Sequence, residues 1–328
     1  MQVLKHSVTN SNEQLHWQPS ATFQQLQQRA KYLARIRDFF AQRAYLEVET
    51  PIMGKYGVTD LYLNNMTTYF REKIHYLQTS PEYFMKRLLA AGSGPIYQIA
   101  RVFRDDELGR WHNPEFSLLE WYQLAVDHLY LIEEISIFFQ GVCNWPPVII
   151  YTYAEVFKLA CGINPLVDSI AVLQNKLTEY NLHDVLLQDE VDRDQYLFLL
   201  MTHIVEPYLA SLQAPVAVID FPASQAALAQ IVGNCAQRFE IYYQGVELAN
   251  GFHELINWDE QQQRFADDRQ KRRLHGLVDI AMDEQFLAAL EHGLPACSGV
   301  ALGLDRLLAL VLQQPDIAAV QAFNYVNL

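Results

Sequence analysis

Two arginines that lie far apart in the sequence each follow an apolar, strand-like run, and this pairing constrains the fold more than any other feature. Arg104 ends the stretch Arg101-Val-Phe-Arg104, and Arg306 ends the stretch Gly299–Arg306. The second arginine also opens a helix-like run at residues 307–313. Both guanidinium groups can therefore point into one cleft lined by a sheet. Two fixed cations in such a cleft indicate a triphosphate ligand.

The charge balance argues against nucleic acid as a partner. The chain has 328 residues, of which 51% are hydrophobic, and a formal net charge of −14. This length allows one large domain or two ordinary ones, with a large core in either case. Proteins that grip nucleic acid through its phosphates usually present a basic face. An extensive RNA footprint is therefore not expected, and transfer RNA is not an expected partner.

The amino-terminal segment and the cysteines indicate a cytoplasmic protein. Residues 1–19 are polar and contain no apolar core of signal-peptide length. The longest apolar runs fall far short of the roughly 20 residues that span a bilayer. The cysteines are scattered without Cys-x-x-Cys spacing, which predicts buried free thiols and no zinc site or disulfide framework. No membrane contact is expected.

Apolar periodicity predicts a single α+β domain around an antiparallel sheet. The predicted helices cover residues 23–43, 82–91, 260–274 and 283–292. The predicted strands cover residues 96–103, 116–122, 216–221 and 238–247, and the first two form an antiparallel hairpin. Residues 124–212 are expected to be a mostly helical insertion or lid, and residues 1–22 an amino-terminal extension. This order of elements suits an α+β domain better than a βαβ repeat.

Several common nucleotide and metal motifs are absent. The chain has neither a glycine-rich loop ending in Gly-Lys-Ser or Gly-Lys-Thr nor a Gly-x-Gly-x-x-Gly pattern. His253-Glu254 begins like the helix of a zinc protease, but Asn257 stands where the second histidine would be. A nucleotide must therefore be held in another way.

Four stretches occur in the order typical of one enzyme family. They are Glu49-Thr50-Pro51, Arg101–Tyr122 with its segment His112-Asn-Pro-Glu-Phe116, Glu247–Leu255, and Gly299–Arg306. Together they resemble the catalytic domain of class II aminoacyl-tRNA synthetases, most closely the lysyl branch, from about residue 23 to the carboxyl terminus. The resemblance implies an antiparallel sheet flanked by helices, a homodimer formed through the first stretch, and ATP and Mg²⁺ as cofactors of amino acid activation.

The resemblance also implies a nucleotide site. Arg104 would bridge the carboxylate of the amino acid and the α-phosphate, and Arg306 would hold the γ-phosphate. The other residues implied for ATP are Asp106, where the family has glutamate, His112, Phe116, which would stack on the adenine, Glu240 and Glu247. Glu240 and Glu247 match the magnesium-binding pair. Their odd spacing places them on opposite faces of a regular strand, unless a turn at Gln244-Gly245 separates them.

The amino acid pocket implied by the resemblance is built for a cation. Glu120 and Glu254, assisted by Tyr122, match the groups that bind the ε-ammonium of lysine, whereas Ser80 and Glu82 lie at the α-amino end. The substrate chain would be lined by Asn250, Phe252 and Ala301. Three carboxylates in a closed pocket repel one another unless a dication or protons compensate them, which favours a diamino acid. Taken singly, Arg104 or Glu240 is more often part of a surface ion pair, and the alternative for Glu120 and Tyr122 is a solvated face of the sheet.

Two departures from the lysyl synthetases narrow the resemblance. Too few residues precede Glu49 for an anticodon-binding barrel, and Gly57-Val58-Thr59-Asp60 replaces a loop of small residues. These features are similar to those of the elongation factor P lysine ligases. That similarity implies activation of lysine, preferably (R)-β-lysine, as the adenylate, and its transfer to the ε-amine of a lysine on elongation factor P.

Three alternatives stay open at this point. The first is a minimal lysyl-tRNA synthetase without the barrel. The second is a small-molecule amino acid ligase on the same fold, similar to asparagine synthetase. The third is a regulatory subunit that binds amino acid or nucleotide without catalysis. The acids Glu120 and Glu254 argue against the second, and the presence of Arg104 and Arg306 argues against the third.

Overall fold

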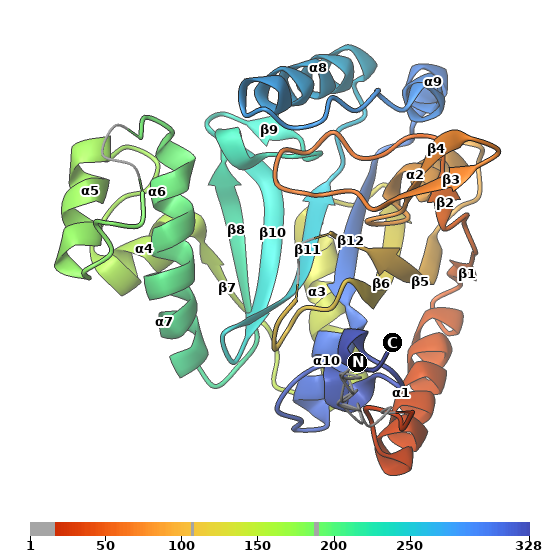
Figure 1. The fold of residues 1–328 in the computed structure, drawn as a ribbon. Coiled ribbons are helices and arrows are strands. Elements are labelled where there is room, and N and C mark those ends of the chain that lie inside the picture. The colour runs from red at the N-terminus through yellow and green to blue at the C-terminus, as the bar shows by residue number, and fades with distance from the viewer. Residues whose placement is uncertain (1–16, 106–107, 187–189) are drawn as a thin grey trace, which may run out of the picture.

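A large, mostly antiparallel sheet forms the centre of the molecule (Figure 1). The computed structural model describes residues 17–105, 108–186 and 190–328. In order of pairing, the strands are β1 (Leu46–Glu47), β5 (Ile96–Phe103), β6 (Glu115–Leu124), β12 (Cys297–Gly303), β11 (Val246–His253), β10 (Cys235–Tyr243), β8 (Val216–Pro222) and β7 (Ile149–Thr152). Only the outer pairs β1/β5 and β7/β8 are parallel among these, and β9 (Ile231–Val232) pairs with β10. The predicted α+β class is confirmed.

The main core lies between one face of this sheet and three helices. These are α1 (Phe23–Ala41), α3 (His128–Phe138) and α10 (Leu304–Val311). Phe40 of α1 stacks on Tyr97 of β5 with ring centroids 4.4 Å apart, and Trp121 of β6 is fully buried beside it. The side chain of Thr22 caps α1 by accepting a hydrogen bond from the backbone of Gln25. The predicted helix at residues 23–43 is confirmed and ends slightly earlier.

Alternation along β6 separates this core from the opposite face of the sheet. Leu119 and Trp121 contribute to the main core, whereas Leu118, Glu120 and Tyr122 point to the other side. Successive side chains of a strand point to opposite faces, so one strand serves both purposes. The polar positions of β6 are therefore held by the same packing that buries its apolar positions.

A second core joins a helical region to the outer edge of the sheet, at the left of Figure 1. Its helices are α4 (Tyr153–Cys161), α5 (Ile170–Glu179), α6 (Arg193–Leu200) and α7 (Glu206–Ser211), with a π-helical turn at Met201–Val205. Another π-helical turn, at Phe139–Cys143, belongs to the main core. The described parts of residues 124–212 are mostly helical, and their role as an insertion or lid stays a prediction. However, α3 packs in the main core, and β7 extends the central sheet.

Above the sheet, as drawn in Figure 1, three helices and a small sheet complete the fold. The helices are α2 (Glu82–Ala90), α8 (Trp258–Leu274) and α9 (Glu284–Gly293). The small antiparallel sheet has the order β2 (Met53–Gly54), β4 (Lys73–Leu77) and β3 (Thr67–Phe70), and short 3₁₀ turns lie at Ala223–Gln225, Ala318–Val320 and Tyr325–Asn327. Within the described ranges, none of the helices combines the length and apolarity that crossing a bilayer requires.

Candidate active site

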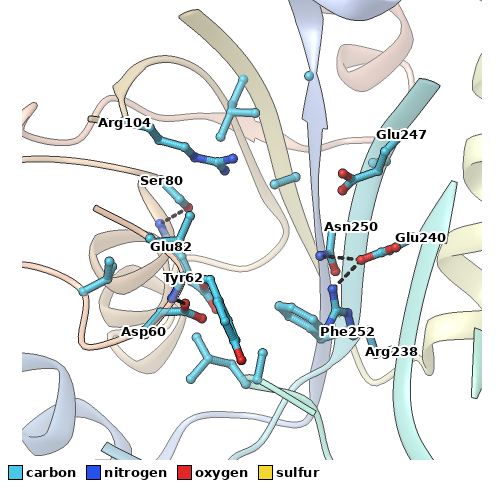
Figure 2. A pocket seen from close by; sticks show the side chains of 18 of the residues that line it. Asp60, Tyr62, Ser80, Glu82, Arg104, Arg238, Glu240, Glu247, Asn250 and Phe252 are labelled. Atoms are coloured by element: carbon cyan, nitrogen blue, oxygen red, sulfur yellow. Dashed lines mark hydrogen bonds and ion pairs between the residues drawn. The ribbon is translucent and has the colours of Figure 1, made fainter. Parts of the chain in front are cut away.

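A cavity of about 650 Å³ opens on the face of the sheet opposite the main core. Figure 2 shows its two walls: Arg104, Ser80, Glu82 and Asp60 on one side, and Glu247, Asn250, Glu240 and Phe252 on the other. Apolar pockets of this size with a few convergent polar groups are typical binding sites. Most predicted site residues line this cavity, and Glu120, Tyr122 and Glu254 line a small pocket that adjoins it. Asp106 lies outside the described residues.

Arg306 sits where the third motif passes from β12 into α10. Its guanidinium donates to the backbone oxygens of Trp111 at 3.1 Å and Glu247 at 2.8 Å, and its Nη2 lies 2.6 Å from Nε2 of His112. The preceding Asp305 is buried and accepts hydrogen bonds from Arg29 at 2.6 Å and from the backbone of Ser117 at 2.9 Å. The arginine is thus held at one end of the cavity by three separate segments of the chain.

Arg104 lies beyond the end of β5, where its backbone amide donates to the carbonyl of Pro114 at 3.0 Å. The carbon centre of its guanidinium lies 5.1 Å from the ring centroid of Phe116. Both side chains line the cavity, and Figure 2 shows the guanidinium of Arg104 reaching across it from the wall that carries Ser80. An aromatic ring and two arginines in one cleft suit an adenine base with its phosphates.

A hairpin turn places Glu240 and Glu247 on the same face. Gln244 and Gly245 both have positive φ, at 52° and 75°, and form the two-residue turn between β10 and β11. Tyr242 pairs with Glu247 across this turn, so Glu247 shares the face of Tyr242 and therefore of Glu240. A register shift beside Ile241 brings Asn250 onto the same side opposite Glu240. The expected turn between the two acids is confirmed.

The two acids differ in their surroundings. Glu240 is buried and accepts hydrogen bonds from Arg238, Tyr242 and Asn250. Glu247 is 40% exposed at its side chain, and its Oε2 lies 3.7 Å from Nη1 of Arg306. Mg²⁺ usually takes one or two carboxylates together with substrate phosphates and water. The pair fits that donor set, with Glu247 as the more accessible ligand.

The small adjoining pocket, called here the deep end of the site, holds the acids predicted for the amino acid. Glu120 accepts hydrogen bonds from the hydroxyl of Ser80 at 2.7 Å and from that of Tyr122 at 2.8 Å. The hydroxyl of Ser80 in turn accepts from the backbone of Glu82 at 3.0 Å, at the start of α2. Burial and the nearby Glu82 carboxylate raise the pKa of Glu120 to about 8, although the hydrogen bonds from Ser80 and Tyr122 lower it.

Close packing of β12 against its neighbours shapes this end. A Cβ atom at Gly299 would lie 2.2 Å from Cε1 of Tyr122 and 2.5 Å from Oε1 of Glu254, so no larger residue fits there without movement. Ala301 pairs with Glu120 on one side and with Asn250 on the other. Because paired positions face the same way, its methyl group lies between these two polar side chains.

Sequence reasoning missed several charged residues of the site. Lys86 is 1% exposed and lies 2.7 Å from Oε1 of Glu82 and 2.6 Å from Oε2 of Glu254. The three acids are therefore partly compensated by the protein itself, which the sequence-based expectation of a dication or protons alone overlooked. Arg238, Glu206 and Asp268 were missed as well, because nothing in the local sequence relates them to partners that are distant in the chain. Asp60 was noted only as part of the loop at residues 57–60.

Two of these carboxyls have altered acidity. Burial and the adjacent acids Glu247 and Glu240 raise the pKa of Glu206 to about 7. Burial and the neighbouring Asp60 raise the pKa of Asp268, which lines the cavity from α8, to about 6. Asp60 and Asp268 thus add two acids to the lining of the cavity, whereas Glu206 lies behind it beside Glu240 and Glu247. No group of three or more metal-ligating side chains occurs in the part of the chain that the structure describes.

Residues 6–327 of the chain match the family of class II tRNA synthetases (D, K and N). The chain belongs to this family. Several class II relatives carry the name elongation factor P–(R)-β-lysine ligase. The protein of that name from Pasteurella multocida (strain Pm70) is 46% identical over 324 residues, which cover 96% of this chain and 99% of the relative. Those from Haemophilus influenzae (strain PittGG) and Vibrio cholerae (strain N16961) are each 46% identical, over 95% and 97% of this chain and 98% and 99% of their own lengths.

Proposed function

We propose that the protein is an ATP-dependent ligase that activates lysine, preferably (R)-β-lysine, and transfers it to the ε-amine of a lysine on elongation factor P. The observation that carries this proposal is near-full-length similarity, at 46% identity, to relatives named for that reaction. The acidic pocket around Glu120 and Glu254 supports a substrate with an ammonium side chain. The same two acids argue against a substrate with an uncharged side chain, such as that of an asparagine synthetase.

The first half-reaction joins two anions. An oxygen of the lysine carboxylate attacks the α-phosphorus of ATP, a P–O bond forms, and pyrophosphate leaves with the electrons of the bond that breaks. Arg104 would hold the carboxylate against the α-phosphate, and Arg306 with His112 would hold the γ-phosphate of a bent ATP stacked on Phe116. Such positioning and charge neutralisation supply most of the catalysis in phosphoryl chemistry.

Magnesium would be held mainly by Glu247, with Glu240 beside it, and would neutralise phosphate charge when bound. The fixed partners of Glu240, namely Arg238 and Tyr242, keep that carboxylate in place for this purpose. The chain's own arginines then position the phosphates from the opposite side of the cavity.

In the second half-reaction, the neutral ε-amine of the acceptor lysine attacks the carbonyl carbon of the adenylate. A C–N bond forms, AMP leaves with the electrons of the acyl C–O bond, and the amine loses a proton. At the deep end, Glu120, Glu254 and Tyr122 would hold the side-chain ammonium of the activated lysine, and Ser80 and Glu82 its other amino group. Asn250, Phe252 and Ala301 would line the chain between them.

We further propose a cytoplasmic homodimer. Exposed apolar side chains gather on the segment that includes Glu49-Thr50-Pro51 and on the small sheet that follows it: Leu46, Ile52, Met53, Phe70 and Ile74 are 54%, 45%, 40%, 52% and 51% exposed. Exposed apolar side chains that are concentrated in one region are typical of a protein interface. The proposed dimer would cover them.

ATP–pyrophosphate exchange tests the activation step. We expect lysine-dependent exchange by the wild type, and a loss of about a hundredfold to a thousandfold in Arg306→Ala, the range for removing one preorganised electrostatic contact. Arg269→Ala is the matched control, because Arg269 pairs with Asp279 at the surface. Wild-type exchange rates in Arg306→Ala would refute the assignment of this arginine.

A further inference from the structure

Lys86 is a buried cation directly behind the amino acid pocket. Its ammonium bridges Glu82, one helical turn earlier in α2, and Glu254, which follows β11. The ring of Phe286 in α9 lies 5.8 Å from the nitrogen and closes the site on that side. Lys86 itself does not line the pocket, whereas Glu82 and Glu254 do. A charge this deeply buried is tolerated only because both partners are ionic.

The charges around the pocket can be counted. Glu82, Glu120 and Glu254 contribute three negative charges when ionised, and Lys86 contributes one positive charge, so the fully ionised pocket carries a net charge of −2. A free diamino acid brings two ammonium groups, and its carboxylate belongs with Arg104 in the proposed function. The charge of the pocket and the charges of the two ammonium groups then sum to zero. An amino acid with an uncharged side chain would leave one buried carboxylate without a counter-charge, which is costly.

We infer that Lys86 is a positioning and specificity-determining residue, which fixes Glu82 and Glu254 and sets the pocket charge that a diamino acid neutralises. This inference rests on the proposed activation of lysine and assigns a part of its specificity to a residue that does not touch the substrate. Lys86 acts through the two carboxylates that its ammonium contacts, and both of them line the pocket.

Removing the ammonium changes the acids that remain. Burial lowers the pKa of Lys86, but the attraction of Glu254 and Glu82 outweighs it and keeps the group charged. Burial raises the pKa of Glu254, and Lys86 opposes that rise. Without Lys86, the carboxyls would take up protons and would bind an ammonium group more weakly. The titratable groups that face this site are Glu82, Glu120, Tyr122, Glu254 and Cys297.

The test compares Lys86→Met in two backgrounds, wild type and Glu254→Gln, by lysine-dependent pyrophosphate exchange between pH 6.5 and pH 9. In the wild-type background, we expect the KM for lysine to rise about tenfold or more, equivalent to about 1.4 kcal/mol. The KM for ATP should change little, and the defect should shrink as the pH rises and the acids ionise. In the Glu254→Gln background, adding Lys86→Met should change the KM for lysine by less than about threefold.

Two results would overturn the inference: an unchanged KM for lysine in Lys86→Met, or the same factor in both backgrounds. If Lys86→Met alone fails to fold, the comparison of Glu254→Gln with the double variant remains decisive. The double variant replaces the buried Lys86–Glu254 pair by neutral groups and leaves only the less buried Glu82 without its cation. A tenfold difference between those two variants would also overturn the inference. Absence of lysine-dependent exchange in the wild type would instead refute the proposed function.

Discussion

Burial of Glu120 governs how the pocket responds to pH. The carboxyl is 1% exposed and is hydrogen-bonded by Ser80 and Tyr122, yet burial and Glu82 raise its pKa to about 8. Below that pH the empty pocket holds a proton on this group. An ammonium ion needs the ionised form, so binding of the substrate must expel the proton.

We therefore predict that lysine binding releases protons at pH 7 and that its affinity increases as the pH rises through about 8. The sign follows from the raised pKa: the free protein carries the proton below that value, and the complex does not. Calorimetry in buffers of different ionisation enthalpy measures the release. Glu120→Gln should bind lysine more weakly and release fewer protons. Equal release by both proteins at pH 7 would rule out Glu120 as the source.

Substitution of Gly299 tests how closely side chains pack at the same pocket. Because a Cβ atom there would lie 2.2 Å from Tyr122 and 2.5 Å from Glu254, Gly299→Ala must displace groups that hold the ammonium. We expect the KM for lysine to rise about tenfold or more, the scale of a displaced polar contact, with a smaller change for ATP. Gly141→Ala is the control, since nothing lies within 4 Å of its built Cβ. Equal KM values for lysine in the two variants would contradict this packing.

At the scale of elements, regular alternation was predictable and local breaks in it were not. The hairpin expected at residues 96–103 and 116–122 is present as β5 and β6, because both are short runs rich in apolar and aromatic residues on either side of a polar loop. The strand expected at residues 238–247 is divided between β10 and β11, since a two-residue turn leaves little trace in the apolar pattern. The sequence did not predict β7, because its four residues lie between helical segments of the chain. Lys86 could not be assigned, because its partner Glu254 is distant in sequence.

Asp305 joins elements that are distant in sequence and holds the start of α10, where Arg306 lies. It is 2% exposed and binds Arg29 of α1, the backbone of Ser117 in β6 and Gln321. We predict that Asp305→Ala lowers the free energy of unfolding by about 3 kcal/mol, as expected when one partner of a buried pair is removed. Urea unfolding measures the change. Asp279→Ala, which breaks an exposed pair, should cost less than about 1 kcal/mol. A similar small cost at Asp305 would contradict the anchoring role.

For the whole molecule, the exposed apolar surface near β1 and the small sheet predicts a dimer. Ile52 is 45% exposed within this surface. We expect the wild type to sediment as a dimer and Ile52→Glu to shift it toward monomer, because a buried unpaired charge at an interface is unfavourable. Val191→Glu, at an 81% exposed position away from this surface, should leave the dimer intact. A monomeric wild type at micromolar concentration would contradict the prediction.

The most direct test of the proposed function is intact-mass analysis of elongation factor P and of lysine transfer RNA after incubation with the protein, ATP, Mg²⁺ and either lysine or (R)-β-lysine. We predict a mass increase of one lysyl unit on elongation factor P, larger in yield with (R)-β-lysine, and none on the RNA. Charging of the RNA alone, or no modification of either acceptor, would contradict the proposal.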